Sequence, residues 1–304
     1  MRILITGSNG MLGSDLVKVL SPSYEVFGVG LHENKQLEIP YEQIDLTVRA
    51  SVLKTVAQIQ PAIIIHSAAY TDVDGCELNP NQAYLMNTKA TQYVAEASDQ
   101  TGATLFFISS DYIFDGKKTS PYLEVDQGNP ISVYGRSKFE AEEWLKANSR
   151  SVTIIRSSWL YGNNGRNFFK AILARISKKE PLQVVNDQYG APTYTKDLAE
   201  GIASLIKKGK RVKGFDIYHL ANSGKTTWYE VAKKVIEKVG EPIMITPISS
   251  EQLNRPAKRP KNSIFDMTKI KSTYQLSLRS WEDAFNDYWE TELKKEWFQP
   301  SKRN

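Results

Sequence analysis

The sequence predicts an α/β fold, with a doubly wound, mostly parallel sheet covered by helices on both faces and a smaller C-terminal lobe. Short apolar runs alternate with segments of helical spacing through the first 165 residues. Such runs are typical of parallel strands, which are buried on both faces. The first run leads directly into a glycine-rich turn. With 41% hydrophobic and 24% charged residues in a chain of 304, the composition is that of an ordinary globular protein.

The first strand is expected at Arg2 to Thr6, and a helix is expected from Ser14 to Leu20. Between them, glycines at three-residue intervals permit a tight turn and a close approach of the backbone to a ligand. Free amides at the start of the helix favour a pyrophosphate. A glycine-rich turn without a ligand is the alternative, but the position after a first strand favours a Rossmann nucleotide site. We expect the cofactor to contact Gly7, Asn9, Gly10, Met11, Leu12 and Gly13.

The second strand, Tyr24 to Val29, ends without the Asp or Glu that would bind an adenosine ribose. His32 or Lys35, which follow it, could instead attract a 2′-phosphate. NADPH is therefore the favoured cofactor, and NADH stays open. Asp45 and Leu46 stand where such folds place residues near adenine, although an ordinary turn explains Asp45 equally well.

Two later strands are expected to end at the same ligand-binding edge of the sheet. The strand from Pro61 to His66 is followed by Ala68, Ala69 and Tyr70, and small residues there let a ribose or ring approach the backbone. The strand from Thr104 to Ile108 leads into Ser109, Ser110 and Asp111. The Ser110 hydroxyl is thus a candidate for binding a substrate oxygen.

Tyr134 and Lys138 lie four residues apart in a predicted helix that begins near Val133, so they share one face of it. A nearby ammonium favours the phenolate and lowers the phenol pKa from its usual value of about 10, which suits proton transfer. The spacing alone is weak, because Tyr229 and Lys233 repeat it. That second pair lies in an ordinary amphipathic helix without a strand-end hydroxyl.

Beyond the strand Val152 to Arg156 the alternation becomes irregular. We expect residues 1–165 to form the cofactor domain and 166–304 to form mainly the substrate-binding lobe, with segments near 182–222 returning to the sheet. Within the lobe, a proline- and arginine-rich stretch runs from Arg255 to Ser263. Its cations on a rigid turn would suit a diphosphate, although a solvated basic loop is equally consistent with the composition.

Composition argues against several other classes of protein. A net charge of +5, scattered or in short runs such as Lys207 to Arg211, is not the clustered stripe of a nucleic-acid-binding protein. One cysteine, Cys76, and three histidines make a metal site unlikely to form, so we expect none. No signal peptide or membrane span is apparent, and we expect a cytoplasmic protein without nucleic-acid or membrane partners.

Taken together, these motifs resemble the extended short-chain dehydrogenase/reductase family, and within it the dTDP-4-dehydrorhamnose reductase family. The resemblance covers nearly the whole chain. The glycine loop and Tyr-x-x-x-Lys are common to the wider group, whereas the later motifs are more specific. Ser110 stands where these enzymes usually carry threonine, which keeps the hydroxyl. The motifs are Ile3 to Gly13, Ala68 to Thr71, Ser109 to Phe114, Tyr134 to Lys138, Arg156 to Gly162, Asn186 to Thr193 and Arg259 to Ser263.

The resemblance implies an oxidoreductase that reduces dTDP-4-dehydro-β-L-rhamnose to dTDP-β-L-rhamnose with NADPH or NADH. It implies that Tyr134 is the general acid, that Lys138 binds the nicotinamide ribose, and that Ser110 binds the C4 carbonyl. Trp159 would pack against the sugar and Arg259 would hold the diphosphate or line the substrate cleft. The substrate-binding set is then Ser110, Asp111, Tyr112, Tyr134, Trp159 and Arg259.

Other functions stay open at this point. A nucleotide-sugar dehydratase would need a carboxylate pair after Ser110, but Tyr112 follows Asp111 here. An epimerase would leave its cofactor unchanged overall. A non-catalytic NADP-binding regulatory subunit, similar to that of methionine adenosyltransferase, would not need the Ser110, Tyr134 and Lys138 set. A homodimer is a further possibility that the sequence does not decide.

Overall fold

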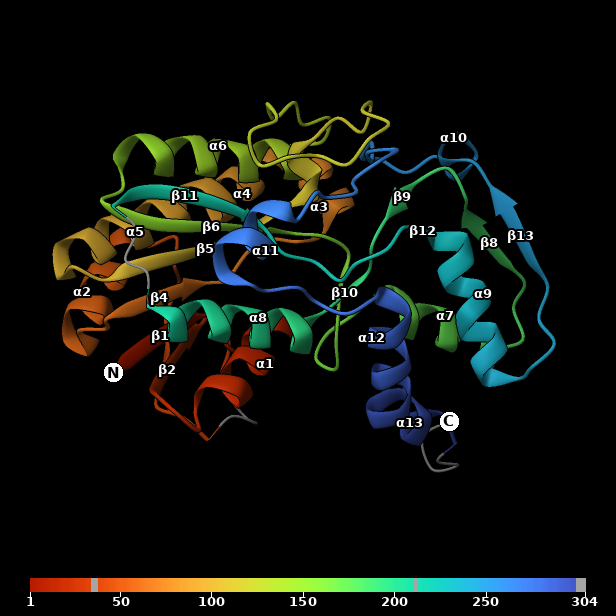
Figure 1. Ribbon diagram of the computed structural model, residues 1–304, viewed down its shortest axis with the longest axis horizontal. Helices are drawn as coiled ribbons and strands as arrows, with labels where there is room; N and C mark the ends of the chain where they lie inside the picture. Colours follow the sequence, from red (N-terminus) through yellow and green to blue (C-terminus); the bar gives the residue numbers. More distant parts are fainter. Residues whose placement is uncertain (34–37, 210–212, 299–304) are drawn as a thin grey trace.

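The predicted central sheet is present and has seven parallel strands among the described residues, in the order β11-β6-β5-β4-β1-β2-β3 (Figure 1). The computed structural model describes residues 1–33, 38–209 and 213–298. The doubly wound α/β fold is therefore confirmed. The strands are β1 (Arg2–Thr6), β2 (Glu25–Gly30), β3 (Tyr41–Gln43), β4 (Ile63–His66), β5 (Thr104–Ser110), β6 (Ser151–Ser157) and β11 (Gly214–His219).

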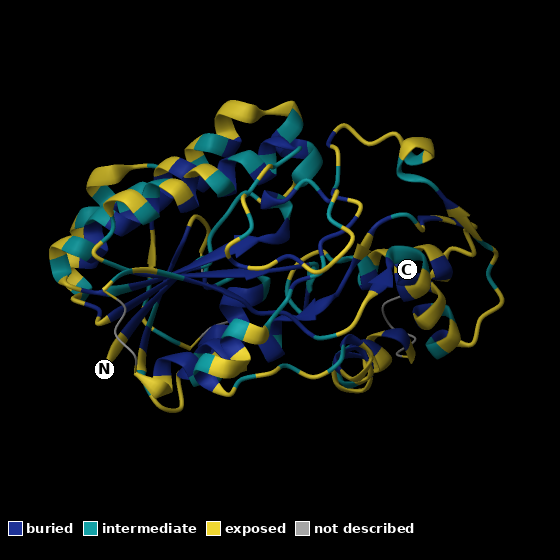
Figure 2. Ribbon diagram, turned by 45° about the horizontal axis from the view of Figure 1, so that its top comes forward, coloured by how far each residue is buried: buried dark blue, intermediate teal, exposed yellow. Residues whose placement is uncertain are grey.

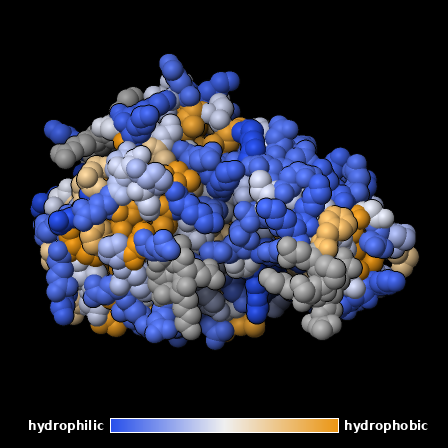
Figure 3. Space-filling model, turned by 90° about the horizontal axis from the view of Figure 1, so that it is seen from below, coloured by the Kyte–Doolittle hydropathy of each residue, from blue (hydrophilic) through white to orange (hydrophobic). Residues whose placement is uncertain are grey.

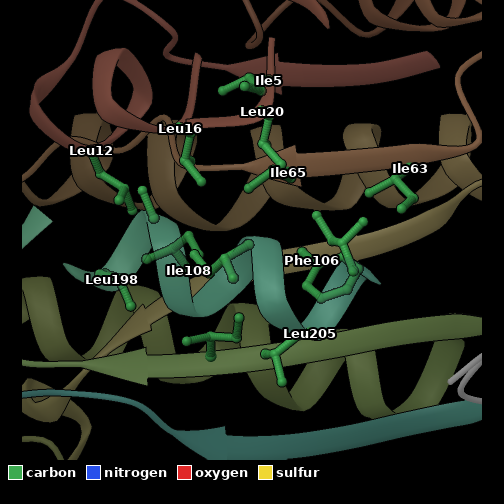
Figure 4. Close-up of a cluster of buried hydrophobic side chains, with 14 of the residues drawn as sticks. Ile5, Leu12, Leu16, Leu20, Ile63, Ile65, Phe106, Ile108, Leu198 and Leu205 are labelled. Atoms are coloured by element: carbon green, nitrogen blue, oxygen red, sulfur yellow. The ribbon is translucent and has the colours of Figure 1, made fainter. Parts of the chain in front are cut away.

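Helices cover both faces of this sheet, and side chains that alternate along each strand divide between two cores. Ile5 of β1 packs with helices α1 (Met11–Leu20) and α8 (Thr195–Lys208), as Figure 4 shows for Leu16 and Leu198. Leu4 packs on the other face, against α2 (Arg49–Ile59), α5 (Ala90–Thr101) and α6 (Val133–Asn148). Each buried Leu or Ile stabilises the fold by roughly 1.5–3 kcal/mol. Figure 2 shows the strands buried between half-exposed helices.

Short helical segments shape the chain where it leaves β4 and β5. After β4 come α3 (Val73–Leu78), α4 (Pro80–Tyr84) and a π-helical turn η1 (Leu85–Lys89), which runs on into α5. After β5 comes the 3₁₀ turn η2 (Asp111–Ile113). Such π-helical turns frequently mark functional sites. Both segments lie at the carboxyl end of the sheet, where α/β folds bind ligands.

The C-terminal lobe has its own aromatic-rich core, which includes Phe169, Trp281, Phe285, Tyr288 and Trp289. Strand β8 pairs with β13 in a separate two-stranded sheet, so the chain returns to the main sheet only with α8 and β11, not near residue 182. The remaining elements are β7 (Leu160–Tyr161), α7 (Phe168–Ser177), β8 (Leu182–Val185), β9 (Tyr189–Gly190), β10 (Thr193–Tyr194), β12 (Thr226–Thr227), α9 (Trp228–Val239), β13 (Ile245–Ile248), α10 (Ser250–Leu253), α11 (Thr268–Tyr274), α12 (Trp281–Tyr288), η3 (Trp289–Leu293) and α13 (Lys294–Phe298).

A buried ion pair fixes α6 against β6. Arg156 of β6 donates to Glu142 of α6 through Nη2, at 2.7 Å, and through Nε, at 3.1 Å, and both side chains are almost fully buried. A third bond, from Arg156 Nη1 to the Glu124 carbonyl, ties in the loop before α6. Because α6 carries Tyr134 and Lys138, this pair helps to set their position.

Glu142→Ala is expected to lower the free energy of unfolding by about 3–5 kcal/mol, because it leaves the Arg156 charge buried without a partner. Urea unfolding followed by circular dichroism would measure the loss. The neighbouring Glu143→Ala is the matched control, since Glu143 is half-exposed, pairs only with Lys146 in the described contacts, and should cost less than about 1 kcal/mol. Equal losses in the two variants would contradict the role of the buried pair.

The surface gives no sign of a membrane-spanning segment within the described residues, because none of their helices combines the length and apolar character that crossing requires. Figure 3 shows mainly hydrophilic side chains on the face seen from below, with hydrophobic ones interspersed. The described residues also contain no cluster of three or more His, Cys, Asp or Glu side chains that could hold a metal ion.

Candidate active site

The glycine-rich loop folds into a compact turn between β1 and α1. Gly7 adopts a φ of +67°, and a Cβ there would come within 2.9 Å of Ala68 Cα, so only glycine fits both the conformation and the space. The Gly7 amide donates to Val29 O, and the Gly10 amide donates to Gly7 O. Ala68, one of the predicted cofactor contacts, thus lies directly against this loop.

Asn9 connects the glycine loop to the end of β2. Its Nδ2 donates to the carbonyls of His32 and Glu33 and to the Tyr41 hydroxyl, which in turn donates to the His32 carbonyl. The enclosed Asn9 Oδ1 accepts no hydrogen bond from the described residues. Together with the loop, it offers a polar group that a bound nucleotide can satisfy, so this end of the sheet fits a dinucleotide.

The other residues proposed for adenosine binding lie along the same side. The His32 side chain is exposed, while Lys35 lies outside the described residues. Asp45 accepts from the Thr47 amide and hydroxyl at 2.8 and 2.7 Å, which makes it a turn residue in this conformation. Leu46 is buried in the core under α2. Cofactor contact through Asp45 and Leu46 remains a prediction.

The segment after β4 is held by Asn87 of the π-helical turn. Asn87 Oδ1 accepts from the Tyr70 amide at 2.7 Å, and its Nδ2 donates to the Tyr70 carbonyl and to Ser137 Oγ. Ser137 lies beside Lys138 on α6. This buried amide therefore joins the Ala68 to Tyr70 segment to the helix of the candidate catalytic pair, a link that spans 50 residues of sequence.

Ser110 and Tyr134 come together at the carboxyl end of the sheet. Ser110 is the last residue of β5, and Tyr134 lies in the first turn of α6, partly exposed. A Cβ on Gly135 would collide with the Tyr112 carbonyl, so glycine at this position lets the helix approach the turn that follows Ser110. Burial raises the pKa of Tyr134 well above its usual value, and a hydrogen bond with Ser110 only partly opposes this. A phenol in this state stays protonated and can donate.

Lys138 extends from α6 beneath the same strand. Its Nζ donates to the Ile108 carbonyl at 2.6 Å and lies 4.1 Å from the centre of the Phe107 ring. Burial lowers the pKa of this amine to about 7, and Glu142 opposes the shift. Apart from burial, the groups that act most strongly on the pKa of Tyr134 are Ser110, Asp111, Tyr112 and Cys76. The net shift is upward, so any lowering by Lys138 is outweighed by burial in this conformation, in which the amine is bound to the Ile108 carbonyl.

Asp111 is enclosed directly beside Ser110. Asp111 is only 1% exposed, and its Oδ1 accepts a hydrogen bond from the Ser110 hydroxyl at 3.0 Å. Burial raises its pKa to about 6, although the hydroxyls of Ser263 and Ser110 act in the opposite direction. At neutral pH this carboxyl is thus far easier to protonate than an ordinary aspartate.

Arg259 also reaches this site, but with its charge already paired. Its guanidinium donates to Asp74 of α3 at 3.1 and 2.9 Å and to the Ala257 carbonyl. It also lowers the pKa of the Tyr112 hydroxyl, against the larger effect of burial. The Tyr112 ring meets the Tyr134 ring edge to face at 5.5 Å. A substrate phosphate would therefore have to share Arg259 with Asp74. Sequence reasoning missed Asp74, because nothing local links residues 185 positions apart.

Trp159 forms part of an aromatic stack in the lobe. Its ring lies 3.8 Å from that of Trp228 and almost parallel to it, and Phe168 adds a third ring. Its backbone has a φ of +49°, which is uncommon for a residue other than glycine and occurs at functional sites. Trp228 is a second aromatic group that the sequence did not single out. Contact of Trp159 with a sugar remains a prediction.

The second Tyr-x-x-x-Lys pair shows what an ordinary helix does with the same spacing. Tyr229 packs against the core of the lobe, and Lys233 pairs with Glu230 on the surface of α9. Neither lies at a strand end of the main sheet. The structure thus separates the two pairs as the sequence predicted.

A parallel sheet with a glycine loop after β1, a hydroxyl at the end of β5 and a Tyr-Lys helix beside it defines the nucleotide-dependent short-chain dehydrogenases and reductases. Within this class, the family described as "RmlD substrate binding domain" matches residues 1–293, and the chain belongs to that family.

Similar proteins support this placement. The spore coat polysaccharide biosynthesis protein SpsK of Bacillus subtilis is 36% identical, with 94% of this chain and 96% of that protein covered. A dTDP-4-dehydrorhamnose reductase of Aggregatibacter actinomycetemcomitans is 35% identical, with 94% and 97% covered. A solved Bacillus anthracis dTDP-4-dehydrorhamnose reductase in complex with NADP superposes with a TM-score of 0.85 at 36% identity, covering 95% and 98%. The resemblance to this reductase family is confirmed.

Proposed function

We propose that this chain reduces dTDP-4-dehydro-β-L-rhamnose to dTDP-β-L-rhamnose with NADPH. The observation that carries the proposal is the convergence of Ser110 and Tyr134 at the carboxyl end of β5, with Lys138 beneath the same strand. A hydroxyl pair in this place suits a carbonyl oxygen that gains negative charge. The activity named for the relatives gives the substrate class.

Each residue has a defined task in this reaction. NADPH, when bound, supplies the hydride that adds to C4 of the sugar. Tyr134 gives its phenolic proton to the oxygen at C4 as charge develops there, and Ser110 donates a hydrogen bond to the same oxygen. Lys138 binds the nicotinamide ribose hydroxyls. The phenolate left on Tyr134 regains a proton from water, so one proton is consumed for each ketone reduced.

The cofactor preference rests on the end of β2. The strand itself ends without a carboxylate to bind the ribose 2′-hydroxyl or to repel a 2′-phosphate, since the nearest acid, Glu33, belongs to the following loop. His32 is exposed beside the loop held by Asn9. NADPH therefore fits better than NADH. The NADP bound by the B. anthracis relative agrees with this preference.

Substrate binding is assigned to residues around the catalytic pair. Tyr112 lies next to Tyr134, and Arg259 lies beside the Tyr112 hydroxyl. Arg259 meets the diphosphate if it exchanges part of its bond to Asp74. Trp159, at the edge of the lobe, would pack on the sugar. The aromatic Tyr112 also occupies the position where a dehydratase needs a second carboxylate, which argues against that chemistry.

The test is an incubation of the purified protein with NADPH and the keto-sugar nucleotide, followed by the near-ultraviolet absorbance of NADPH. Reduction requires one NADPH oxidised for each alcohol formed, with NADH giving a lower kcat/KM. Neither an epimerase nor a dehydratase consumes NADPH in this way. Binding of NADPH without any oxidation would instead favour a regulatory subunit.

A further inference from the structure

The hydrogen bonds of Ser110 use its full capacity in this conformation. A serine hydroxyl can donate one hydrogen bond and accept two. Ser110 donates to Asp111 Oδ1 at 3.0 Å, accepts from the Tyr112 amide at 3.2 Å, and shares a hydrogen bond with Tyr134. Its single proton is therefore directed at Asp111, and no donor is left for a substrate oxygen.

Asp111 is enclosed and has no cationic partner among the described residues. Its Oδ2 has no partner within hydrogen-bond geometry among these residues. The hydroxyls of Ser263 and Ser110 and the backbone amides of Asp111 and Tyr112 favour the anion, but burial outweighs them. The groups around it are the Tyr112 phenol on its own turn, the Tyr134 phenol on α6 and the Ser263 hydroxyl of the C-terminal segment. The neighbouring cation, Arg259, is bound to Asp74. A buried carboxylate without a cationic partner is costly, whereas a neutral acid in the same place is not.

We propose that Asp111 is a positioning residue that acts as a neutral acid: its protonated carboxyl donates to Ser110 Oγ and turns the Ser110 hydroxyl toward the substrate oxygen. In that arrangement Ser110 accepts from Asp111 and from the Tyr112 amide and donates to the carbonyl at C4. Tyr134 is then also free to donate to that carbonyl. This inference rests on the proposed reduction and specifies how the same site becomes competent.

The charge of Asp111 also affects the pKa of the Tyr134 phenol, and this effect favours the neutral acid as well. Ionised Asp111 raises the pKa of the Tyr134 phenol, which makes it a weaker proton donor, and it also raises the pKa of Tyr112. Neutral Asp111 removes this effect. Because Asp111 keeps its proton throughout, the proton that reaches the substrate still comes from Tyr134, and the overall balance of the reaction is unchanged.

The pH profile of Asp111→Asn tests the proposal, because an amide is uncharged at every pH and can donate to Ser110 as the protonated acid does. The acid is protonated below its pKa of about 6 and ionised above it. Wild-type kcat/KM should therefore fall about tenfold per pH unit above that value. Asp111→Asn should lack the fall that Asp111 causes and should exceed wild type about tenfold or more at pH 8. Any fall caused by the Lys138 amine, whose pKa is about 7, should be shared by wild type and variant.

Asp99→Asn is the matched control. Asp99 accepts from the Arg150 amide at the far end of α5, away from the site, so its variant should keep the wild-type slope. Parallel profiles for wild type and Asp111→Asn, or loss of turnover in Asp111→Asn with NADPH binding intact, would overturn the proposal. Absence of NADPH oxidation at every pH would overturn the proposed function itself and this inference with it.

A measurement on the unaltered protein covers the case in which Asp111→Asn fails to fold. With NADP⁺ bound, the keto-sugar nucleotide binds without being reduced, and calorimetry in buffers of different ionisation enthalpy reports the protons taken up. At pH 8 close to one proton should be taken up per sugar bound, because Asp111 must be protonated to release the Ser110 hydroxyl. Binding without proton uptake would overturn the proposal.

Discussion

Tyr134→Phe is expected to lower kcat by about 10²–10⁴-fold while the NADPH dissociation constant stays nearly unchanged. The change deletes only the hydroxyl that gives its proton to the substrate, and the ring can keep its edge-to-face contact with Tyr112. Steady-state kinetics with the keto-sugar nucleotide would give kcat, and quenching of tryptophan fluorescence would give NADPH binding.

Tyr229→Phe provides the matched control, because Tyr229 begins the other Tyr-x-x-x-Lys sequence and packs against the lobe core. This variant should keep the wild-type kcat. Turnover of Tyr134→Phe within a few-fold of wild type would contradict the assignment of Tyr134 as the general acid.

Lys138→Ala should weaken both NADPH binding and turnover, each by about tenfold or more. Lys138 is only 3% exposed, and its amine lies between the Ile108 carbonyl and the Phe107 ring, in the position from which we expect it to bind the nicotinamide ribose. Because Lys138 is assigned to both cofactor binding and catalysis, its loss should change the NADPH dissociation constant as well as kcat, whereas Tyr134→Phe should change only kcat. Fluorescence titration with NADPH and steady-state kinetics would measure them, with a thermal melt to show that the variant is folded.

For this variant the comparison is Lys233→Ala on α9. Lys233 is half-exposed and pairs with Glu230, so neither kinetic parameter should change. A folded Lys138→Ala protein with wild-type NADPH affinity and kcat would show that the Tyr134 and Lys138 pair is not the active site.

The sequence predicted the main sheet well because its signals are local. The apolar runs at β1 and β4 are continuous, and each is buried on both faces as parallel strands require. The glycine turn is equally local, since the φ of +67° at Gly7 favours glycine through the backbone of that residue alone. Pairing between β8 and β13 lacked such a signal, because short strands in a lobe carry no mark of their partner.

Within the site, features set by neighbouring residues could be predicted from the sequence, whereas contacts between distant residues could not. The position of Ser110 at a strand end and of Tyr134 on the adjacent helix came from neighbouring residues. The bond of Arg259 to Asp74 and the stacking of Trp228 on Trp159 join distant segments, which only the folded chain brings together. The pKa of Tyr134 could not be predicted either, because burial raises it and depends on the whole surroundings of the phenol.

The most direct test of the account follows the transferred hydrogen. NADPH deuterated at the transferring position of the nicotinamide is incubated with the protein and dTDP-4-dehydro-β-L-rhamnose, and the sugar is examined by NMR and mass spectrometry. Reduction at the Ser110 and Tyr134 site should give dTDP-β-L-rhamnose with deuterium at C4, in an amount equal to the NADP⁺ formed. Unlabelled sugar product, or deuterium at any other carbon, would contradict reduction at the Ser110 and Tyr134 site.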